Sequence, residues 1–151
     1  MMVLDTDVVS EAIRAQPDPS VASWLASRPS SSLFVTTITQ AELLHGLQLL
    51  PDGKRRRGLT DAVHTILRDE FRGRVLPFDG PAAEACATIA ARRRARGEPI
   101  SAFDAQIAAI ARSRGAHVAT RNVEDFKDSR GRRPRPLEVE RVNAHSWALS
   151  S

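Results

Sequence analysis

The feature that most constrains the fold is a short apolar run that ends on a carboxylate, Met2-Val3-Leu4-Asp5. An ionised carboxylate in apolar surroundings is costly unless it is paired or ligates a metal, so stability alone does not favour Asp5 at the end of a buried strand. In an α/β fold this position faces the crevice outside the carboxyl ends of the strands, where ligands bind. The pattern therefore predicts a first strand with Asp5 at a ligand site, and then a helix over about residues 7–15 that Thr6 or Asp7 caps.

The rest of the chain alternates between short apolar runs and segments of helical periodicity, over a length of 151 residues that suits one domain. We expect a three-layer α/β/α fold in a single domain, 1–151, with a central, mainly parallel sheet of four to five strands. Further strands are predicted at 33–37, 75–78, 117–120 and, as an edge strand, 137–142. Helices are predicted at 21–25, 39–50, 54–71, 81–96, 101–115 and 122–126, and an exposed basic loop at 128–136.

Three further carboxylates, Glu42, Asp104 and Asp125, share one local pattern. They follow Thr39, Ser101 and Asn122 respectively by three residues, at the predicted start of a helix. For any one of them alone, a capping box that stabilises the helix start by roughly 1 kcal/mol is the simpler interpretation.

Taken together, the three acids indicate a metal site. The helices of a parallel α/β sheet start at the carboxyl ends of the strands, so all three carboxylates are expected beside Asp5. Four carboxylates repel one another unless a cation lies among them, and Mg²⁺ or Mn²⁺ suits a set of oxygen ligands. The four histidines lie on different predicted elements without ligand spacing, and the single cysteine, Cys86, allows neither an intramolecular disulfide nor a thiolate zinc site.

The charge balance makes nucleic acid a plausible partner. The chain has 22 Lys and Arg residues against 18 acidic ones, and only Lys54 and Lys127 are lysines. Arginine binds phosphate in a bidentate manner, although a codon bias explains the arginine count equally well. The basic clusters at 54–57, 92–96 and 130–135 are candidates to bind an RNA backbone, or else solvated faces. Since the sequence has no leader pattern and no membrane span, we expect a soluble, cytoplasmic protein.

In four stretches the chain resembles PIN-domain proteins, specifically the VapC or FitB type of toxin ribonuclease from toxin–antitoxin pairs. The matching stretches are Leu4-Asp5-Thr6-Asp7-Val8-Val9-Ser10-Glu11, Ile38-Thr39-Gln40-Ala41-Glu42-Leu43-Leu44-His45-Gly46, Pro99-Ile100-Ser101-Ala102-Phe103-Asp104-Ala105-Gln106-Ile107-Ala108-Ala109-Ile110-Ala111 and Ala119-Thr120-Arg121-Asn122-Val123-Glu124-Asp125-Phe126. They occur in the family order and span nearly the whole chain.

The resemblance implies a Mg²⁺- or Mn²⁺-dependent endoribonuclease. The residues that hold metal and activate water would be Asp5, Glu42, Asp104 and Asp125, and the supporting polar residues Thr6, Asp7, Thr120 and Asn122. Asp7 stands where the family usually has Asn, so its extra charge could bind metal, cap the helix or disturb the site. Asn122 stands where some relatives carry another acid, which leaves Asp125 as the fourth ligand.

The resemblance also implies partners. These are an RNA substrate and a cognate antitoxin of the VapB or FitA type, whose tail blocks the acidic cleft, often with a basic side chain. A homodimer is expected, as is contact with promoter DNA only through the antitoxin complex.

Two other functions remain open from the sequence. Asp5-Thr6-Asp7-Val8-Val9 also matches the start of haloacid-dehalogenase-type phosphatases, in which Asp5 would be the nucleophile and Asp7 the acid/base. That class needs a downstream catalytic lysine, for which only Lys54 and Lys127 are available. The other alternative is a catalytically inactive PIN module that binds RNA or protein without turnover.

Overall fold

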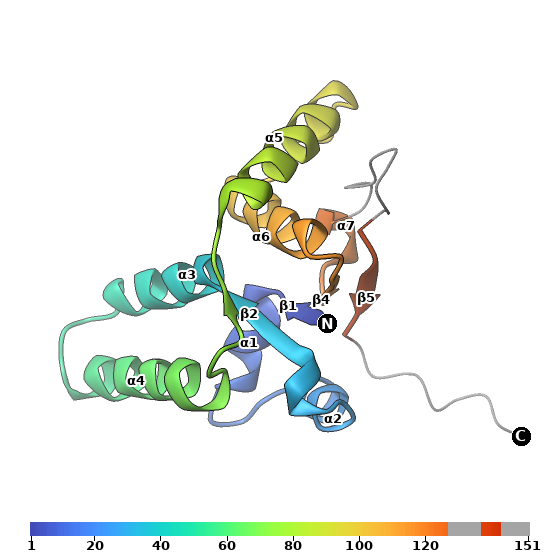
Figure 1. Ribbon diagram of the computed structural model, residues 1–151. Helices are drawn as coiled ribbons and strands as arrows, with labels where there is room; N and C mark the ends of the chain where they lie inside the picture. The colour runs from blue at the N-terminus through green and yellow to red at the C-terminus, as the bar shows by residue number, and fades with distance from the viewer. Residues whose placement is uncertain (127–136, 143–151) are drawn as a thin grey trace, which may run out of the picture.

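The computed structural model describes residues 1–126 and 137–142, and a five-stranded sheet lies at its centre (Figure 1). The strands are β1 (Met2–Leu4), β2 (Leu33–Thr36), β3 (Val75–Leu76), β4 (His117–Thr120) and β5 (Val139–Arg141). They lie in the order β3-β2-β1-β4-β5, and every neighbouring pair is parallel. The predicted parallel sheet is confirmed, with β5 at an edge.

Helices connect the strands and cover both faces of the sheet. They are α1 (Thr6–Ala12), α2 (Pro19–Ala26), α3 (Thr37–Gln48), α4 (Lys54–Thr65), α5 (Gly80–Ala95), α6 (Ala102–Ser113) and α7 (Val123–Phe126). A 3₁₀ turn, η1 (Ser30–Ser32), precedes β2, and a π-helical turn, η2 (Ile66–Glu70), follows α4. In Figure 1, α5 and α6 lie on one side of the sheet and α4 lies on the other.

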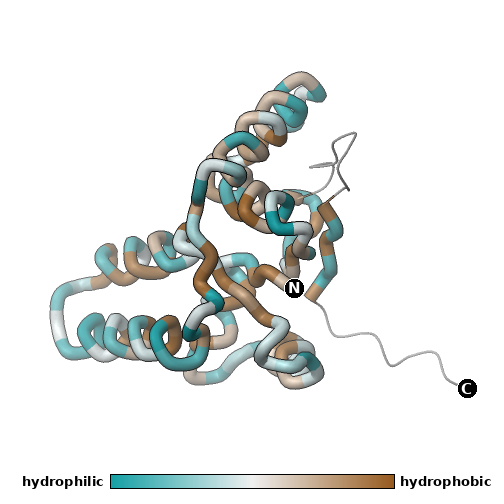
Figure 2. The backbone as a smooth tube through the Cα atoms, viewed as in Figure 1, coloured by the Kyte–Doolittle hydropathy of each residue, from teal (hydrophilic) through white to brown (hydrophobic). Residues whose placement is uncertain are grey.

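The alternation of side chains along β1 divides the core into two layers. Leu4 belongs to one cluster, with residues of α1, α2, α4 and η2, whereas Val3 belongs to the other, with residues of α5, α6 and α7. Both are almost fully buried, as expected for a central strand of a parallel sheet that helices cover on both faces. Figure 2 shows the hydrophobic colour concentrated along the strands, with hydrophilic residues on the outer helices. The three-layer prediction is confirmed.

Two helix starts differ from the prediction. Asp5, rather than Thr6 or Asp7, is the N-cap of α1, because the turn begins directly after β1. The N-cap of α3 is Thr36, three residues before the predicted cap at Thr39. Glu42 therefore lies in the second turn of α3, and its predicted capping role is wrong.

Two other boundaries are also corrected. The predicted helix at 54–71 is regular only to Thr65, after which the π-helical turn η2 carries the chain to Glu70. The predicted strand at 75–78 pairs with β2 only through Val75 and Leu76. The predicted loop at 128–136 lies outside the described residues. Among the described helices, none has the length and hydrophobicity needed to cross a membrane.

Candidate active site

The predicted acids are carried by elements that start or end at the carboxyl edge of the sheet. Asp5 follows β1, Asp104 lies in the first turn of α6, and Asp125 lies in α7 just after β4. Glu42 reaches the same region from the second turn of α3. We refer to Asp5 with Glu42 as the Asp5–Glu42 half of the site, and to Asp104 with Asp125 as the Asp104–Asp125 half.

Asp5 is a buried carboxylate, with only 6% of its surface exposed. Its Oδ1 accepts a hydrogen bond from the backbone N–H of Thr6 (2.7 Å), and its Oδ2 accepts one from the hydroxyl of Thr120 (2.9 Å). Burial raises the pKa of Asp5 to about 6 and the charge of Asp104 adds to the rise, although the hydrogen bond from Thr120 opposes it. Burial and the nearby like charge both disfavour the ionised form of Asp5. A cation bound beside this carboxylate would stabilise the ionised form.

A chain of threonine hydroxyls fixes the position of Glu42. The hydroxyl of Thr6 donates to Glu42 Oε1 (2.7 Å) and lies 2.8 Å from the hydroxyl of Thr39. The backbone N–H of Thr39 donates in turn to Thr36 Oγ1 (3.1 Å), which ties the network to the N-cap of α3. Thr36 and Thr39 are fully buried, so the hydrogen bond between these two residues is shielded from water, whereas Thr6 and Glu42 are half-buried. The sequence did not indicate this role of Thr36, which was predicted only as part of a strand.

The Asp104–Asp125 half is held through helix starts and backbone contacts. The backbone N–H of Asp104 donates to Ser101 Oγ (3.1 Å), which confirms Ser101 as the predicted N-cap of α6. Burial raises the pKa of Asp104, the hydrogen bond with Ser101 lowers it, and the charge of Asp125 raises it again. Asp125 itself is exposed at the surface, and its backbone N–H donates to the carbonyl of Asn122 (3.0 Å).

The chemistry of the four carboxylates suits a divalent cation, but their side chains are spread apart. Among the described residues, no three His, Cys, Asp or Glu side chains lie close enough together to enclose a metal ion. The negative charge of Asp104 nevertheless adds to the rise in the pKa of Asp5, as the charge of Asp125 does to that of Asp104. Oxygen ligands of this kind match Mg²⁺ and Mn²⁺, and like charges keep such ligands apart unless a cation lies among them.

Asp7 is paired with an arginine rather than left free. The guanidinium of Arg121 lies 3.9 Å from Asp7, 3.5 Å from Glu11 and 3.7 Å from Asp18. Arg121 follows Thr120, so it joins the end of β4 to α1 and to the start of α2. The pairing offsets the extra charge that Asp7 brings and points to a structural role for it. Since the partners are more than 100 positions apart in the sequence, no local pattern indicated this cluster.

The basic run at 92–96 was predicted to bind an RNA backbone or to form a solvated face. Arg93 does not fit either prediction, because its side chain is buried. Only 6% of its surface is exposed, whereas Arg94 and Arg96 are exposed. Arg93 Nε donates to the carbonyl of Glu98 (2.7 Å), and its NH1 donates to the carbonyl of Asp125 (3.3 Å). The cluster at 130–135 lies outside the described residues.

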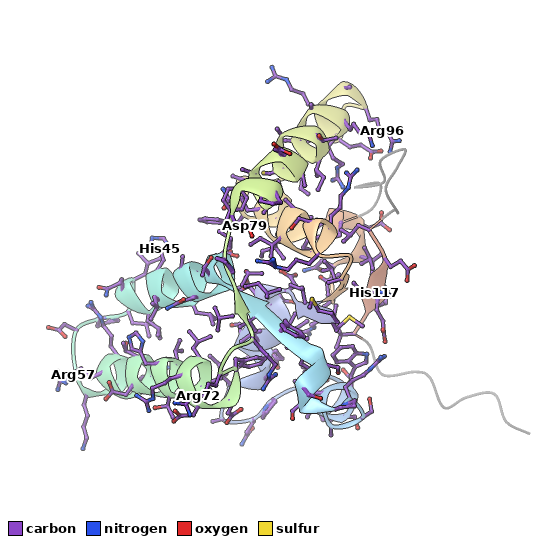
Figure 3. The ribbon with its side chains drawn as sticks, in the orientation of Figure 1. His45, Arg57, Arg72, Asp79, Arg96 and His117 are labelled. Atoms are coloured by element: carbon purple, nitrogen blue, oxygen red, sulfur yellow. The ribbon has the colours of Figure 1, made fainter. Side chains whose placement is uncertain are left out.

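Two of the four histidines, His45 and His117, lie far apart on α3 and β4 (Figure 3). His117 Nε2 lies 3.1 Å from Glu138 at the edge of the sheet, and His45 is exposed. In Figure 3, Arg57 lies on α4, Arg72 in the turn that follows η2 and Arg96 at the C-cap of α5, so these three do not form a single basic patch.

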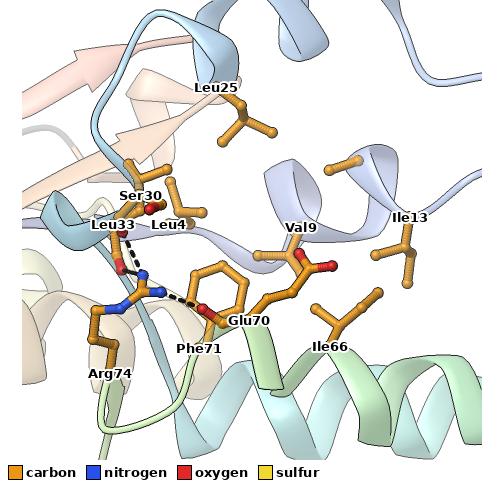
Figure 4. A pocket seen from close by; sticks show the side chains of 11 residues that line it. Leu4, Val9, Ile13, Leu25, Ser30, Leu33, Ile66, Glu70, Phe71 and Arg74 are labelled. Carbon is orange, nitrogen blue, oxygen red and sulfur yellow. Dashed lines mark hydrogen bonds between the residues drawn. The ribbon is translucent and has the colours of Figure 1, made fainter. Parts of the chain in front are cut away.

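A pocket of about 270 Å³ borders the Asp5–Glu42 half. Thr6, Glu42 and Gly46 form part of its wall, and a Cβ atom added at Gly46 would meet no atom within 4 Å apart from its chain neighbours and the backbone of α3. A second pocket, of about 300 Å³, lies elsewhere, between α1, α2, β2 and η2, and is mostly apolar (Figure 4). At its edge Arg74 donates to the carbonyls of Ser30 and Leu33.

Residues 2–130 match the family model described as PIN domain. The chain belongs to the PIN domain family. The expected resemblance is thereby confirmed at the level of the family, and the phosphatase alternative is not favoured.

Several relatives are similar over most of their length to this PIN domain. Toxin FitB of Neisseria gonorrhoeae is 39% identical, covering 83% of this chain and 91% of FitB. VapC ribonuclease Y4jK of Sinorhizobium fredii is also 39% identical, covering 84% of this chain and 91% of the relative. Among solved structures, FitAB bound to an IR36 DNA fragment includes a chain that is 34% identical, with a TM-score of 0.83, covering all of this chain and 99% of that one.

Proposed function

We propose that this PIN domain is the toxin of a type II toxin–antitoxin pair and acts as a divalent-metal-dependent endoribonuclease. The observation that carries the proposal is the buried carboxylate of Asp5, held by Thr6 and Thr120 at the carboxyl end of β1 with the charge of Asp104 beside it. A buried anion beside other anions lowers stability unless a cation binds there, so the arrangement is better explained by function than by stability. The similarity to toxin FitB and to a VapC ribonuclease supports the same activity.

The proposed ligands of Mg²⁺ or Mn²⁺ are Asp5, Glu42, Asp104 and Asp125. Such an ion, when bound, lowers the pKa of a water molecule and offsets negative charge on the phosphodiester. Thr6 and Thr120 support the site by fixing Glu42 and Asp5 in place. Asn122 lies at the turn that leads into α7, where its backbone N–H donates to Thr120 Oγ1 (3.0 Å).

Glu42 orients the attacking water in this proposal. Its Oε1 accepts the hydroxyl hydrogen of Thr6, which leaves Oε2 as the acceptor for a hydrogen of that water.

The proposed partners follow from the similarity to toxin FitB and to a VapC ribonuclease. They are an RNA substrate, a second copy of this chain in a homodimer, and a cognate antitoxin of the VapB or FitA type. The solved structure of FitAB bound to a DNA fragment supports contact with promoter DNA through the antitoxin complex. A basic side chain of the antitoxin, placed among the acids, would take the position of the cation and so inhibit cleavage.

The experiment that tests this function is cleavage of a total RNA pool by the purified protein with Mn²⁺ or Mg²⁺. Three controls accompany it: EDTA, Asp5→Asn and Asp104→Asn. We expect defined fragments that disappear in all three controls, and sequencing their ends identifies the substrate. Cleavage that persists in the variants contradicts the assigned site.

Assays of RNA binding and of phosphate-monoester hydrolysis, run on the same purified protein, test the two alternatives. If RNA binds equally well with and without divalent metal and is never cut, the chain is a catalytically inactive PIN binding module. If it hydrolyses a phosphate monoester through an aspartyl intermediate on Asp5, the phosphatase hypothesis returns.

A further inference from the structure

Arg93 is a buried cation whose position the proposed reaction does not by itself require. It lies near the end of α5, in a run of arginines, and only 6% of its surface is exposed. Burying a guanidinium is costly unless its donors are satisfied, and here Nε and NH1 donate to the carbonyls of Glu98 and Asp125. A lysine has a single, non-planar ammonium group, and a glutamine side chain is shorter and has both N–H donors on one nitrogen, so neither reproduces contacts made from two separate nitrogens.

The two carbonyls belong to the two segments that carry the Asp104–Asp125 half. Glu98 lies on the turn that leads from α5 into the N-cap of α6, and its own N–H donates back to the carbonyl of Arg93 (3.0 Å). Asp125 lies in α7, which has only four residues and so has little hydrogen bonding of its own to hold it. Arg93 therefore joins the start of α6 to α7 from behind the site.

The charge of Arg93 also acts on the acids. Burial raises the pKa of Asp104, and the positive charge of Arg93 is one of the effects that oppose this rise. Two opposite effects on a bound cation follow. The charge repels the cation, whereas the contacts to the backbone hold the ligands where a cation binds them both.

We infer that Arg93 is a positioning residue of the proposed metal site, which sets the separation of Asp104 and Asp125 through its contacts to the Glu98 and Asp125 carbonyls. The inference rests on the proposed function, because it concerns the same four carboxylates. Residues that orient metal ligands without touching the metal typically change metal affinity by about 10–100-fold when they are replaced. Positioning is expected to outweigh charge repulsion, so that loss of Arg93 weakens cation binding.

The test is Mn²⁺ binding to the purified full chain, measured by titration calorimetry, for the wild type, Arg93→Lys and Arg93→Gln. Arg94→Gln is the matched control, since it removes the same charge from the neighbouring, exposed position of α5. We expect Arg93→Gln to bind Mn²⁺ about 10–100-fold more weakly and Arg93→Lys to fall in between. Arg94→Gln should bind as the wild type does. Circular dichroism reports whether each variant is folded, and Arg93→Lys decides the result if Arg93→Gln does not fold.

Unchanged or tighter Mn²⁺ binding by a folded Arg93 variant overturns the inference, even if its melting temperature falls, because it shows a role in stability alone. Asp104→Asn is titrated alongside to separate this result from failure of the proposed function. If the wild type does not bind Mn²⁺, or Asp104→Asn binds it equally well, the proposed metal site is wrong and the inference falls with it. Weak binding by the Arg93 variants beside wild-type binding by Arg94→Gln supports both.

Discussion

The two halves of the site are held in different ways. In the Asp5–Glu42 half, side-chain oxygens of the acids accept hydrogen bonds from Thr6 and Thr120, which lie on elements adjacent to the centre of the sheet. In the Asp104–Asp125 half, the described contacts run mainly to the backbone, from a helix cap and from Arg93. The difference indicates that the first half depends on side-chain hydrogen bonds that join the ends of β1 and β4 with α1 and α3, whereas the second depends on how α6 and α7 are placed.

The largest expected difference between the halves is in catalysis. We expect Asp5→Asn to lower RNA cleavage by about 10³-fold and Asp125→Asn by about 10²-fold, because the buried Asp5 is fixed on both oxygens and Asp125 is exposed. Single-turnover rates on one defined RNA fragment measure both effects. Asp7→Asn, which changes a nearby carboxylate paired with Arg121, is the control and should retain most of the activity. Equal losses in both variants would show that the halves contribute alike.

Stability should depend on pH through Asp5 in particular. Its pKa rises from 3.8 to about 6 in the folded protein, so the folded state favours the protonated form. The stabilisation is fully present below about pH 4 and is lost as the pH rises through 6, which amounts to about 3 kcal/mol for a shift of roughly two pKa units. Urea unfolding of the metal-free wild type and of Asp5→Asn between pH 4 and 7 measures this difference.

Asp5→Asn lacks the charge at every pH, so its stability should exceed that of the wild type progressively as the pH rises. Mn²⁺ should restore the stability of the wild type at pH 7 and leave the stability of the variant unchanged. Parallel pH profiles for the two proteins would contradict the assigned burial of an ionised Asp5.

Breaking the threonine network should affect the Asp5–Glu42 half alone. Thr6→Val removes the hydroxyl that donates to Glu42 and contacts Thr39 but keeps the shape of the side chain. We expect cleavage to fall by about 10–100-fold through kcat, as for other groups that orient a ligand or base. Thr88→Val, on the exposed face of α5, is the control. A rise in KM with kcat unchanged would show that Thr6 serves RNA binding instead.

The smallest effect is expected at the cap of α6. Ser101→Ala removes the acceptor for the N–H of Asp104, and the free energy of unfolding should fall by about 1 kcal/mol. Ser113→Ala, at the other end of the same helix, should change it by less than about 0.5 kcal/mol. Thermal or urea unfolding measures both. Mn²⁺ affinity can be compared between Ser101→Ala and Thr6→Val. Equal losses would show that the two halves are equally sensitive to loss of a hydrogen bond that holds one of their acids.

Most of the fold could be predicted because its signals are local. The apolar run before Asp5 and the cap at Ser101 each depend on a few adjacent residues, and both were confirmed. Glu42 was placed at the correct end of the sheet for the wrong reason. The predicted cap was Thr39, whereas the N-cap of α3 is Thr36, the last residue of β2.

The supports of the site could not be predicted, because their partners are distant in sequence. Arg93 lies in a run of arginines whose charge pattern is typical of an exposed helix end, and only the docking of α7 shows that one of them is buried. Arg121 likewise meets Asp7 and Glu11 only once β4 lies beside β1. The roles of the four acids as metal ligands stay predictions until cation binding is measured.

The position of β1 has a consequence for the protein while it is being synthesised. β1 is the first strand made, yet it pairs with β4, and Thr120 donates to Asp5 across 115 positions of sequence. During translation at about 5–20 residues per second, Asp5 waits on the order of ten seconds for Thr120 to leave the ribosome. The candidate site therefore cannot take the form seen in the folded protein before β4 has been synthesised and has paired with β1.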